Sequence, residues 1–311
     1  MAINKVMRAA LKALSYPDID VKKNYKLERQ LVNVTHVHVL KPFYKTWDHT
    51  VSLGDHEIPV RLYSPVQTEE IIGFPLIIYF HGGGWVTGNI DSYDKVCTTL
   101  ARQTRHLVLS VDYRLAPEFP FPAAGEDCYC VSREIFLHPE WFGIESDQIT
   151  LMGDSAGANL AAVVSLMARD RGEFDPKRQI LIYPATYHDH SAASPFASIQ
   201  ENGTGYLLTS KRVCDYMELY MGGKNEWTNP YFAPLLAEDV SRQPNTLLIT
   251  AEYDPLRDEG EAYGRKLLEA GNRVEQHRIA DALHGFFSLP ASFPQVAECY
   301  EYINHFLNGV L

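Results

Sequence analysis

A serine flanked by glycines is the first feature of this 311-residue sequence that could take part in catalysis. Residues 153–157 read Gly-Asp-Ser-Ala-Gly, directly after the apolar run 149–152 and before a stretch of helical spacing. A tight strand-to-helix turn holds a serine in a strained conformation with its hydroxyl exposed, and flanking glycines remove the Cβ atoms that would clash. The helix N-terminus adds positive partial charge. We therefore predict that Ser155 is a nucleophile, the alternative being an ordinary loop.

A serine nucleophile needs a base, and the base needs an acid that orients it. In proteins that carry the serine on a strand-to-helix turn of this sequence pattern, the three residues follow one another along the chain as serine, then Asp or Glu, then His. Asp254 lies just beyond the apolar run 246–250, and His284 lies in a loop after the alternating stretch 273–279. We predict that Asp254 is the orienting acid and His284 the base, the alternative for His284 being a solvated surface residue.

Other residues compete for these two roles. The rival base, His277, falls inside the alternating stretch, where a strand would hold it in the sheet. The rival acids Glu252, Asp258 and Asp281 are less well placed, and we expect Asp258, together with Glu259, to begin the next helix, where acidic side chains are favourable.

Three consecutive glycines follow the apolar run that ends at Phe80. Residues 81–85 read His-Gly-Gly-Gly-Trp. Glycines lose much backbone entropy on folding, but they let N–H groups approach a developing oxyanion without a side chain in the way. The alternative is a phosphate-binding loop, which would carry Gly-Lys-Ser/Thr or Gly-x-Gly-x-x-Gly, and neither is present. Trp85 fits either the core or the wall of a substrate pocket.

The spacing of apolar residues predicts the strands and helices that would position these residues. The run 74–80 is continuous, as in a strand buried on both faces of a parallel sheet. Alternation of such runs with helical spacing predicts an α/β fold with a mostly parallel central sheet and helices on both faces. A hairpin is expected at 46–63. The other strands are expected at 107–111, 149–152, 179–183 and 246–250, and helices at 92–103, 123–138, 158–169 and 259–270.

Composition narrows the function classes. The 28 basic and 39 acidic residues give a net charge of −11, which opposes binding to nucleic acid or anionic membranes.

The five cysteines are odd in number and form no Cys-x-x-Cys pair, so neither a disulfide framework nor a zinc ribbon is expected. The N-terminus has no uninterrupted apolar segment, and no apolar run reaches the length of a transmembrane helix. We predict a cytoplasmic location.

Two histidine pairs are candidate zinc ligands. His36 and His38, like His188 and His190, stand two residues apart and would point the same way on a strand. No third ligand can be assigned from spacing, so we expect solvated loop histidines and no metal.

Four motifs, which occur in a fixed order along the chain, together resemble those of a known protein family. They are the segment 81–85, Asp-Tyr-Arg-Leu-Ala-Pro-Glu at 112–118, Gly-Asp-Ser-Ala-Gly followed by Ala-Asn-Leu-Ala at 153–161, and Asp-Pro-Leu-Arg-Asp-Glu-Gly at 254–260. From about residue 45 to its end, the chain resembles the hormone-sensitive-lipase-like family of α/β-hydrolases, in its bacterial carboxylesterase branch. The resemblance implies the same serine, acid and base, and it adds an oxyanion hole made by the N–H groups of Gly83, Gly84 and Ala156.

The same resemblance implies a helical cap. The amphipathic segment 1–45 and the aromatic-rich insertion 187–229 are expected to cover the site, with the hydrolase core divided into 46–186 and 230–311. Ala158 departs from the family, which usually has glycine there, so closer packing is expected at that point of the helix.

The expected function is a cofactor-free serine carboxylesterase acting on small-molecule, short-chain acyl esters. An amidase acting on small amides or formamides would use the same residues. A ligand-binding protein on the same fold is the alternative outside enzymes, because fold does not fix function. Such a protein should have lost one of the three residues, and all three are present.

Overall fold

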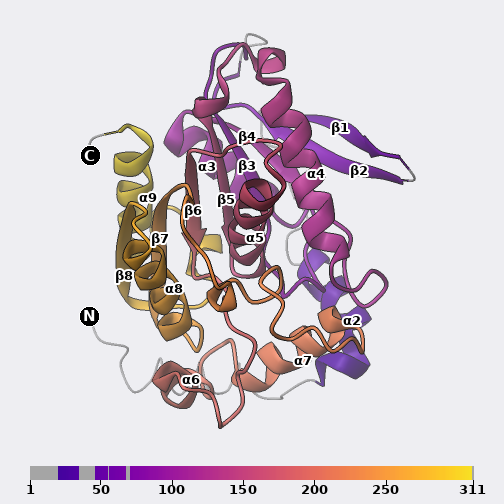
Figure 1. The fold of residues 1–311 in the computed structure, drawn as a ribbon, viewed down its shortest axis with the longest axis vertical. Coiled ribbons are helices and arrows are strands. Elements are labelled where there is room, and N and C mark those ends of the chain that lie inside the picture. The colour runs from indigo at the N-terminus through magenta and orange to yellow at the C-terminus, as the bar shows by residue number, and fades with distance from the viewer. Residues whose placement is uncertain (1–19, 35–45, 55, 68–70, 310–311) are drawn as a thin grey trace.

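The computed structural model describes residues 20–34, 46–54, 56–67 and 71–309 (Figure 1). The predictions for residues 1–19 and 35–45, including the pair His36 and His38, lie outside the described residues.

The described strands form one eight-stranded sheet in the order β1-β2-β4-β3-β5-β6-β7-β8. The hairpin β1–β2 and the β2–β4 pair are antiparallel, and all the remaining pairs are parallel. The strands are β1 Thr46–Leu53, β2 His56–Tyr63, β3 Leu76–Phe80, β4 Leu107–Val111, β5 Ile149–Asp154, β6 Arg178–Ile182, β7 Asn245–Tyr253 and β8 Val274–Leu283.

Helices cover both faces of this sheet (Figure 1). They are α2 Val21–Val34, α3 Asp94–Thr104, α4 Ala123–Leu137, α5 Ala156–Arg171, α6 Ala197–Asn202, α7 Ser210–Met221, α8 Arg257–Glu269 and α9 Pro294–Leu307. Short 3₁₀ turns lie at Pro139–Phe142, Ser146–Gln148, Pro234–Leu236 and Phe286–Ser288. The predicted mostly parallel sheet with helices on both faces is therefore confirmed, whereas α9 was not predicted.

Alternation along each central strand explains the two layers. In β3, Leu76, Ile78 and Phe80 pack into the core cluster that contains α4, α5 and α8. Ile77 and Tyr79 pack into the cluster that contains α3 and α9. Both sets are fully buried, because successive strand residues point to opposite faces and each face is covered. This is why the parallel strands read as unbroken apolar runs.

One end of the sheet collects the remaining helices. Figure 1 shows α6, α7 and α2 gathered there, with α2 lying against α7. Both α6 and α7 belong to the interval 187–229 that interrupts the strand–helix alternation. At this end β3 leads into the glycine loop and β5 into the Ser155 turn. No helix among the described residues combines the length and apolarity needed to cross a membrane.

Candidate active site

The turn at Ser155 has the strained geometry that its flanking glycines predict. Ser155 is the N-cap of α5 with φ 56° and ψ −120°, a region that residues with a Cβ rarely adopt. A Cβ on Gly157 would lie 1.9 Å from the carbonyl oxygen of Phe80, and one on Gly153 would lie 2.3 Å from the backbone of Gly157. Only glycine fits at either position, and the tight packing holds the turn against its strain.

Three predicted residues meet in one hydrogen-bonded chain. Ser155 Oγ lies 2.9 Å from His284 Nε2, and His284 Nδ1 lies 2.7 Å from Asp254 Oδ2. Asp254 is completely buried, and its other oxygen accepts the N–H of Leu256 at 2.9 Å. The carboxylate therefore keeps one oxygen for the imidazole and is held in place by the other. A serine, a base and an orienting acid lie in sequence within hydrogen-bonding distance.

The rival residues lie elsewhere. His277 sits within β8 opposite Ile249, and its ring stacks on Tyr302 with centroids 3.6 Å apart. Glu252 accepts the N–H of Asp281 at 2.7 Å instead of reaching His284. The expectation that His277 would be held in the sheet is confirmed.

Asp258 and Glu259 do lie in the first turn of α8, as expected. Glu259, however, is fully buried. One of its oxygens accepts the N–H of Thr186 at 2.7 Å, and the other lies 2.5 Å from His190 Nε2. The side chain therefore ties α8 to the start of the 187–229 interval.

The glycine loop that follows β3 lies beside Ser155. Gly83 has φ 117° and Gly84 φ 61°, both in the range that glycine tolerates best. The carbonyl of Gly83 accepts the N–H and the hydroxyl of Thr87, at 2.9 and 3.0 Å, which fixes the loop. Within the described residues, the N–H groups of Gly83, Gly84 and Ala156 donate no hydrogen bond. These three donors are therefore free to meet a ligand at the cavity they line.

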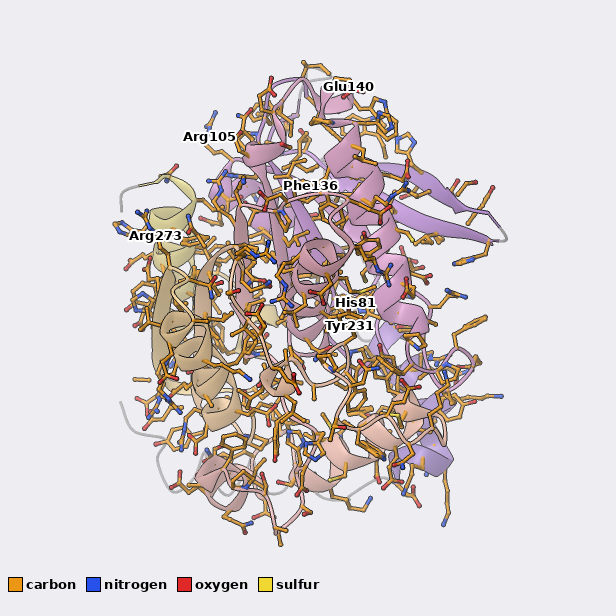
Figure 2. The ribbon with its side chains drawn as sticks, in the orientation of Figure 1. His81, Arg105, Phe136, Glu140, Tyr231 and Arg273 are labelled. Atoms are coloured by element: carbon orange, nitrogen blue, oxygen red, sulfur yellow. The ribbon has the colours of Figure 1, made fainter. Side chains whose placement is uncertain are left out.

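His81 braces this loop from below. It is fully buried, stacks on Tyr113 with centroids 4.3 Å apart, and places Nδ1 2.8 Å from the carbonyl of Gly82. Figure 2 shows His81 in the interior of the molecule, whereas Arg105 and Arg273 lie at its margin. Burial lowers the pKa of His81 to about 4, so the ring is neutral at neutral pH. His81 thus supports the loop without adding a charge to the site.

A small, mostly apolar cavity of about 180 Å³ opens onto Ser155. Trp85 lines it and also stacks on Tyr220, with centroids 4.7 Å apart, so its ring belongs both to the core and to the wall of this cavity. Its other lining side chains include Leu208, Val213, Tyr216 and Leu256. This volume is below the roughly 300–1,000 Å³ of pockets for drug-sized ligands.

Tyr216 is a site residue that the sequence did not single out. Its ring lies over the glycine loop so closely that a Cβ on Gly84 would lie 2.5 Å from the ring. Its hydroxyl donates to Glu28 of α2 at 2.5 Å, and Arg212 pairs with the same carboxylate. Helix α2 therefore contacts the wall of the cavity through Glu28. The sequence marked Tyr216 only as one of many aromatics in the insertion.

Comparison with known proteins identifies the family. Residues 77–288, more than half of the chain, match a family model described as the alpha/beta hydrolase fold. The chain belongs to the α/β-hydrolase family. Within that family it is an ester hydrolase of the branch that resembles hormone-sensitive lipase, as the motifs indicated.

Individual relatives agree with this assignment. The chain is 37% identical to an arylesterase of Saccharolobus solfataricus, over 82% of this chain and 81% of that protein. It is 35% identical to an ethyl acetate hydrolase of Pseudomonas putida, over 78% and 76%. Among solved structures, a hyperthermophilic esterase of Pyrobaculum calidifontis is similar with a TM-score of 0.85 at 35% identity, covering 99% of this chain and 98% of that one.

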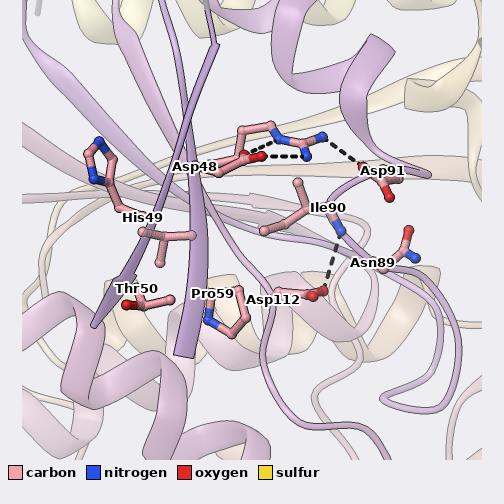
Figure 3. Close-up of a pocket in the computed structure, with 10 residues that line it drawn as sticks. Asp48, His49, Thr50, Pro59, Asn89, Ile90, Asp91 and Asp112 are labelled. Carbon is pink, nitrogen blue, oxygen red and sulfur yellow. Dashed lines mark hydrogen bonds and ion pairs between the residues drawn. The ribbon is translucent and has the colours of Figure 1, made fainter. Parts of the chain in front are cut away.

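A larger groove of this α/β-hydrolase, of about 570 Å³, lies at the hairpin β1–β2 (Figure 3). Its carboxylates have internal partners, since Arg61 pairs with Asp48 at 2.5 Å and with Asp91 at 2.8 Å. Asp112 accepts the N–H of Ile90 at 3.3 Å. The described residues that line this groove include no serine, so the smaller cavity at Ser155 is the candidate active site.

The expectation of solvated histidines at the start of the insertion is wrong for His190. This ring is 1% exposed, because the insertion folds back over α8 and buries it against Glu259. His188 is only partly buried. Among the described residues of this hydrolase, no group of three or more His, Cys, Asp or Glu side chains has the arrangement of a metal site.

Proposed function

We propose that this ester hydrolase is a serine carboxylesterase that acts on small esters with short acyl chains. The observation that carries the proposal is the hydrogen-bonded chain Ser155–His284–Asp254, which faces a small apolar cavity beside three free N–H donors. This arrangement has the parts that acyl transfer needs: a nucleophile, a base with its orienting acid, and donors for an oxyanion.

Acylation begins when Ser155 Oγ attacks the ester carbonyl carbon and His284 Nε2 takes the hydroxyl proton. The carbonyl electrons move onto oxygen, and the N–H groups of Gly83, Gly84 and Ala156 stabilise this oxyanion. Asp254 stabilises the imidazolium and keeps Nε2 toward the serine. Collapse of the intermediate breaks the bond to the alcohol, which leaves with the proton from His284.

Deacylation repeats the chemistry with water. His284 removes a proton from a water molecule as it attacks the acyl-enzyme carbonyl, and the oxyanion forms at the same donors. Collapse then returns the proton to Ser155 Oγ and releases the carboxylic acid. The cycle consumes one ester and one water, and it yields one acid and one alcohol.

The size of the cavity supports a short acyl chain. Each buried CH₂ group contributes about 0.8 kcal/mol, so affinity rises with chain length only while the chain still fits. A cavity of about 180 Å³, walled by Trp85 and Tyr216, limits that length. The net charge of −11 also opposes adsorption to anionic lipid surfaces.

We further propose that α2 and the 187–229 interval act as a cap on a core formed by 46–186 and 230–311. The contacts of Glu28 with Arg212 and Tyr216 support this division, because they join α2 to α7 above the cavity. The cytoplasmic location stays a prediction from cysteine usage. All five cysteines, each in the described part of the chain, are free thiols.

The direct test is kcat/KM for p-nitrophenyl esters from acetate to palmitate, with matched anilides as the amide arm. We expect a maximum between acetyl and about hexanoyl and a steep decline by about ten carbons, since extra CH₂ groups then lack apolar contacts. Anilides should be far poorer substrates than esters of equal acyl length. A maximum at twelve carbons or beyond would contradict the short-chain proposal, and faster anilide cleavage would favour an amidase.

A further inference from the structure

Asp154, the residue directly before the proposed nucleophile, is a buried carboxylate that accepts four hydrogen bonds. Oδ1 accepts the N–H of Gly82 at 2.9 Å and the hydroxyl of Tyr79 at 2.8 Å. Oδ2 accepts the hydroxyls of Tyr93 at 3.1 Å and Tyr183 at 3.3 Å. The carboxyl is 2% exposed, so these donors replace the water that it would otherwise bind.

The set of donors suits an ionised carboxylate. An ionised carboxylate only accepts hydrogen bonds and has about four sites for them. Burial raises the pKa of all three tyrosines well above its ordinary value, so their hydroxyls keep their protons. Burial also raises the pKa of Asp154, and the hydrogen bonds from Tyr79, Tyr93 and Gly82 oppose that shift.

Each oxygen connects Asp154 to a different part of the site. Gly82 is the first glycine of the loop 81–85, and a Cβ there would lie 2.7 Å from Asp154 Oδ2. Glycine at this position therefore lets the loop backbone reach the carboxylate. Tyr93 lines the cavity, and its hydroxyl also accepts the N–H of Gly82 at 3.1 Å. The ring of Tyr183 lies against that of His284, with centroids 4.6 Å apart.

We propose that Asp154 is a positioning residue that fixes the oxyanion loop 81–85 and His284 relative to Ser155. This inference rests on the proposed function. Donors help most when they are already aimed at the place where negative charge develops, and small displacements cost rate. Asp154 acts through Gly82 on the loop and through Tyr183 on the imidazole, and it does not itself touch the reacting atoms.

Replacing Asp154 by Asn tests this role. The Asn amide places an NH₂ group among four donors, so two of the four hydrogen bonds are lost in either orientation of the amide. The lost pair holds either Gly82 of the loop or Tyr183 beside His284, so one of the two connections is broken in each case. We expect kcat for p-nitrophenyl butyrate to fall by at least about tenfold with KM within about threefold, as for an interaction realised in the transition state. The Ki of a short-chain alkyl trifluoromethyl ketone, whose adduct on Ser155 carries an oxyanion, should rise by a similar factor.

Asp127→Asn is the matched control. Asp127 is also completely buried and holds Arg114 and His56 through its two oxygens, but it does not line the cavity. We expect this variant to lose thermal stability while the folded protein keeps the parent kcat and Ki. If Asp154→Asn changes stability only, with kcat and Ki within twofold of the parent, the inference is wrong.

Tyr79→Phe covers the case in which Asp154→Asn does not fold. It removes one donor to Oδ1, the oxygen that holds Gly82, and leaves the ring in the core. A severalfold fall in kcat with an equal rise in Ki supports the inference, and parent values of both overturn it. Ser155→Ala, measured in parallel, separates the two proposals: activity retained there rejects the proposed function, whereas parent kinetics in the Asp154 or Tyr79 variant reject the positioning role alone.

Discussion

The Oγ atom of Ser155 lies 2.9 Å from the Nε2 atom of His284, although the two residues are 129 positions apart in the chain. The strand β5 ends at the serine turn, and the histidine follows the end of the edge strand β8. Parallel strands with their carboxyl ends at one edge of the sheet therefore bring the two groups together.

The choice of base is tested by two alanine variants. His284→Ala should lower kcat by at least about a thousandfold, the scale of losing a member of such a triad. His277→Ala should leave kcat within a few fold of the parent, because His277 stacks on Tyr302 in the sheet. The measurement is kcat for p-nitrophenyl butyrate with both proteins shown to be folded. The reverse pattern would mean that His277 is the base.

Gly84 should not tolerate a side chain. In Gly84→Ala the new Cβ would lie 2.5 Å from the ring of Tyr216, so either the ring or the loop must move. We expect kcat to fall by about a hundredfold, as when one oxyanion donor is lost. Gly172→Ala is the control, since Gly172 has a similar φ of 69° with no atom within 4 Å of the added Cβ. Equal activities of the two variants would contradict this role of the loop.

Contact between α2 and the cavity wall should affect substrate preference. Glu28→Gln removes the charge that holds Arg212 and weakens the bond from Tyr216. We expect KM to rise and the acyl-chain profile to change, because Tyr216 lines the cavity. Lys22→Ala is the control, because Lys22 joins the same two helices through Glu218 on the exposed surface and should keep the parent profile. The prediction fails if Glu28→Gln also keeps the parent profile.

The protein should become less stable as the pH is lowered, because His81 is buried without a proton. Its pKa is lowered to about 4 in the folded protein, against 6.5 ordinarily. Between these values the unfolded chain binds a proton that the folded protein excludes, so the free energy of unfolding falls as the pH drops from 6.5 toward 4. The slope from this group is at most about 1.4 kcal/mol per pH unit.

His81→Phe should remove that slope while keeping a ring against Tyr113. The measurement is urea unfolding of both proteins between pH 4.5 and 7. The stability difference between them should narrow toward low pH. Parallel curves would mean that His81 does not titrate as described.

Local signals in the sequence were sufficient to predict the parts of the site that follow strand ends. Ser155 lies in a recognisable turn. The distinction between His277 and His284 followed from the strand alternation around His277 and from the loop position of His284. The mostly parallel sheet also followed, because strands buried on both faces must read as unbroken apolar runs.

Other features depended on contacts between segments far apart in the chain. Nothing near Tyr216 indicates that α7 places its ring over Gly84, and nothing near Glu28 identifies Arg212 as its partner. His190 was expected to be solvated, because the sequence does not reveal that the insertion folds back onto Glu259. Tertiary packing determines the contacts and the burial of these side chains, and the local sequence pattern carries no information about that packing.

The central claim is that Ser155 is the nucleophile of an esterase. It is tested most directly by kcat/KM of the Ser155→Ala protein for p-nitrophenyl butyrate, purified from a host without background esterases and shown to be folded by circular dichroism. We predict a loss of at least about a thousandfold, as for removal of a triad nucleophile. Activity within tenfold of the parent would contradict the account.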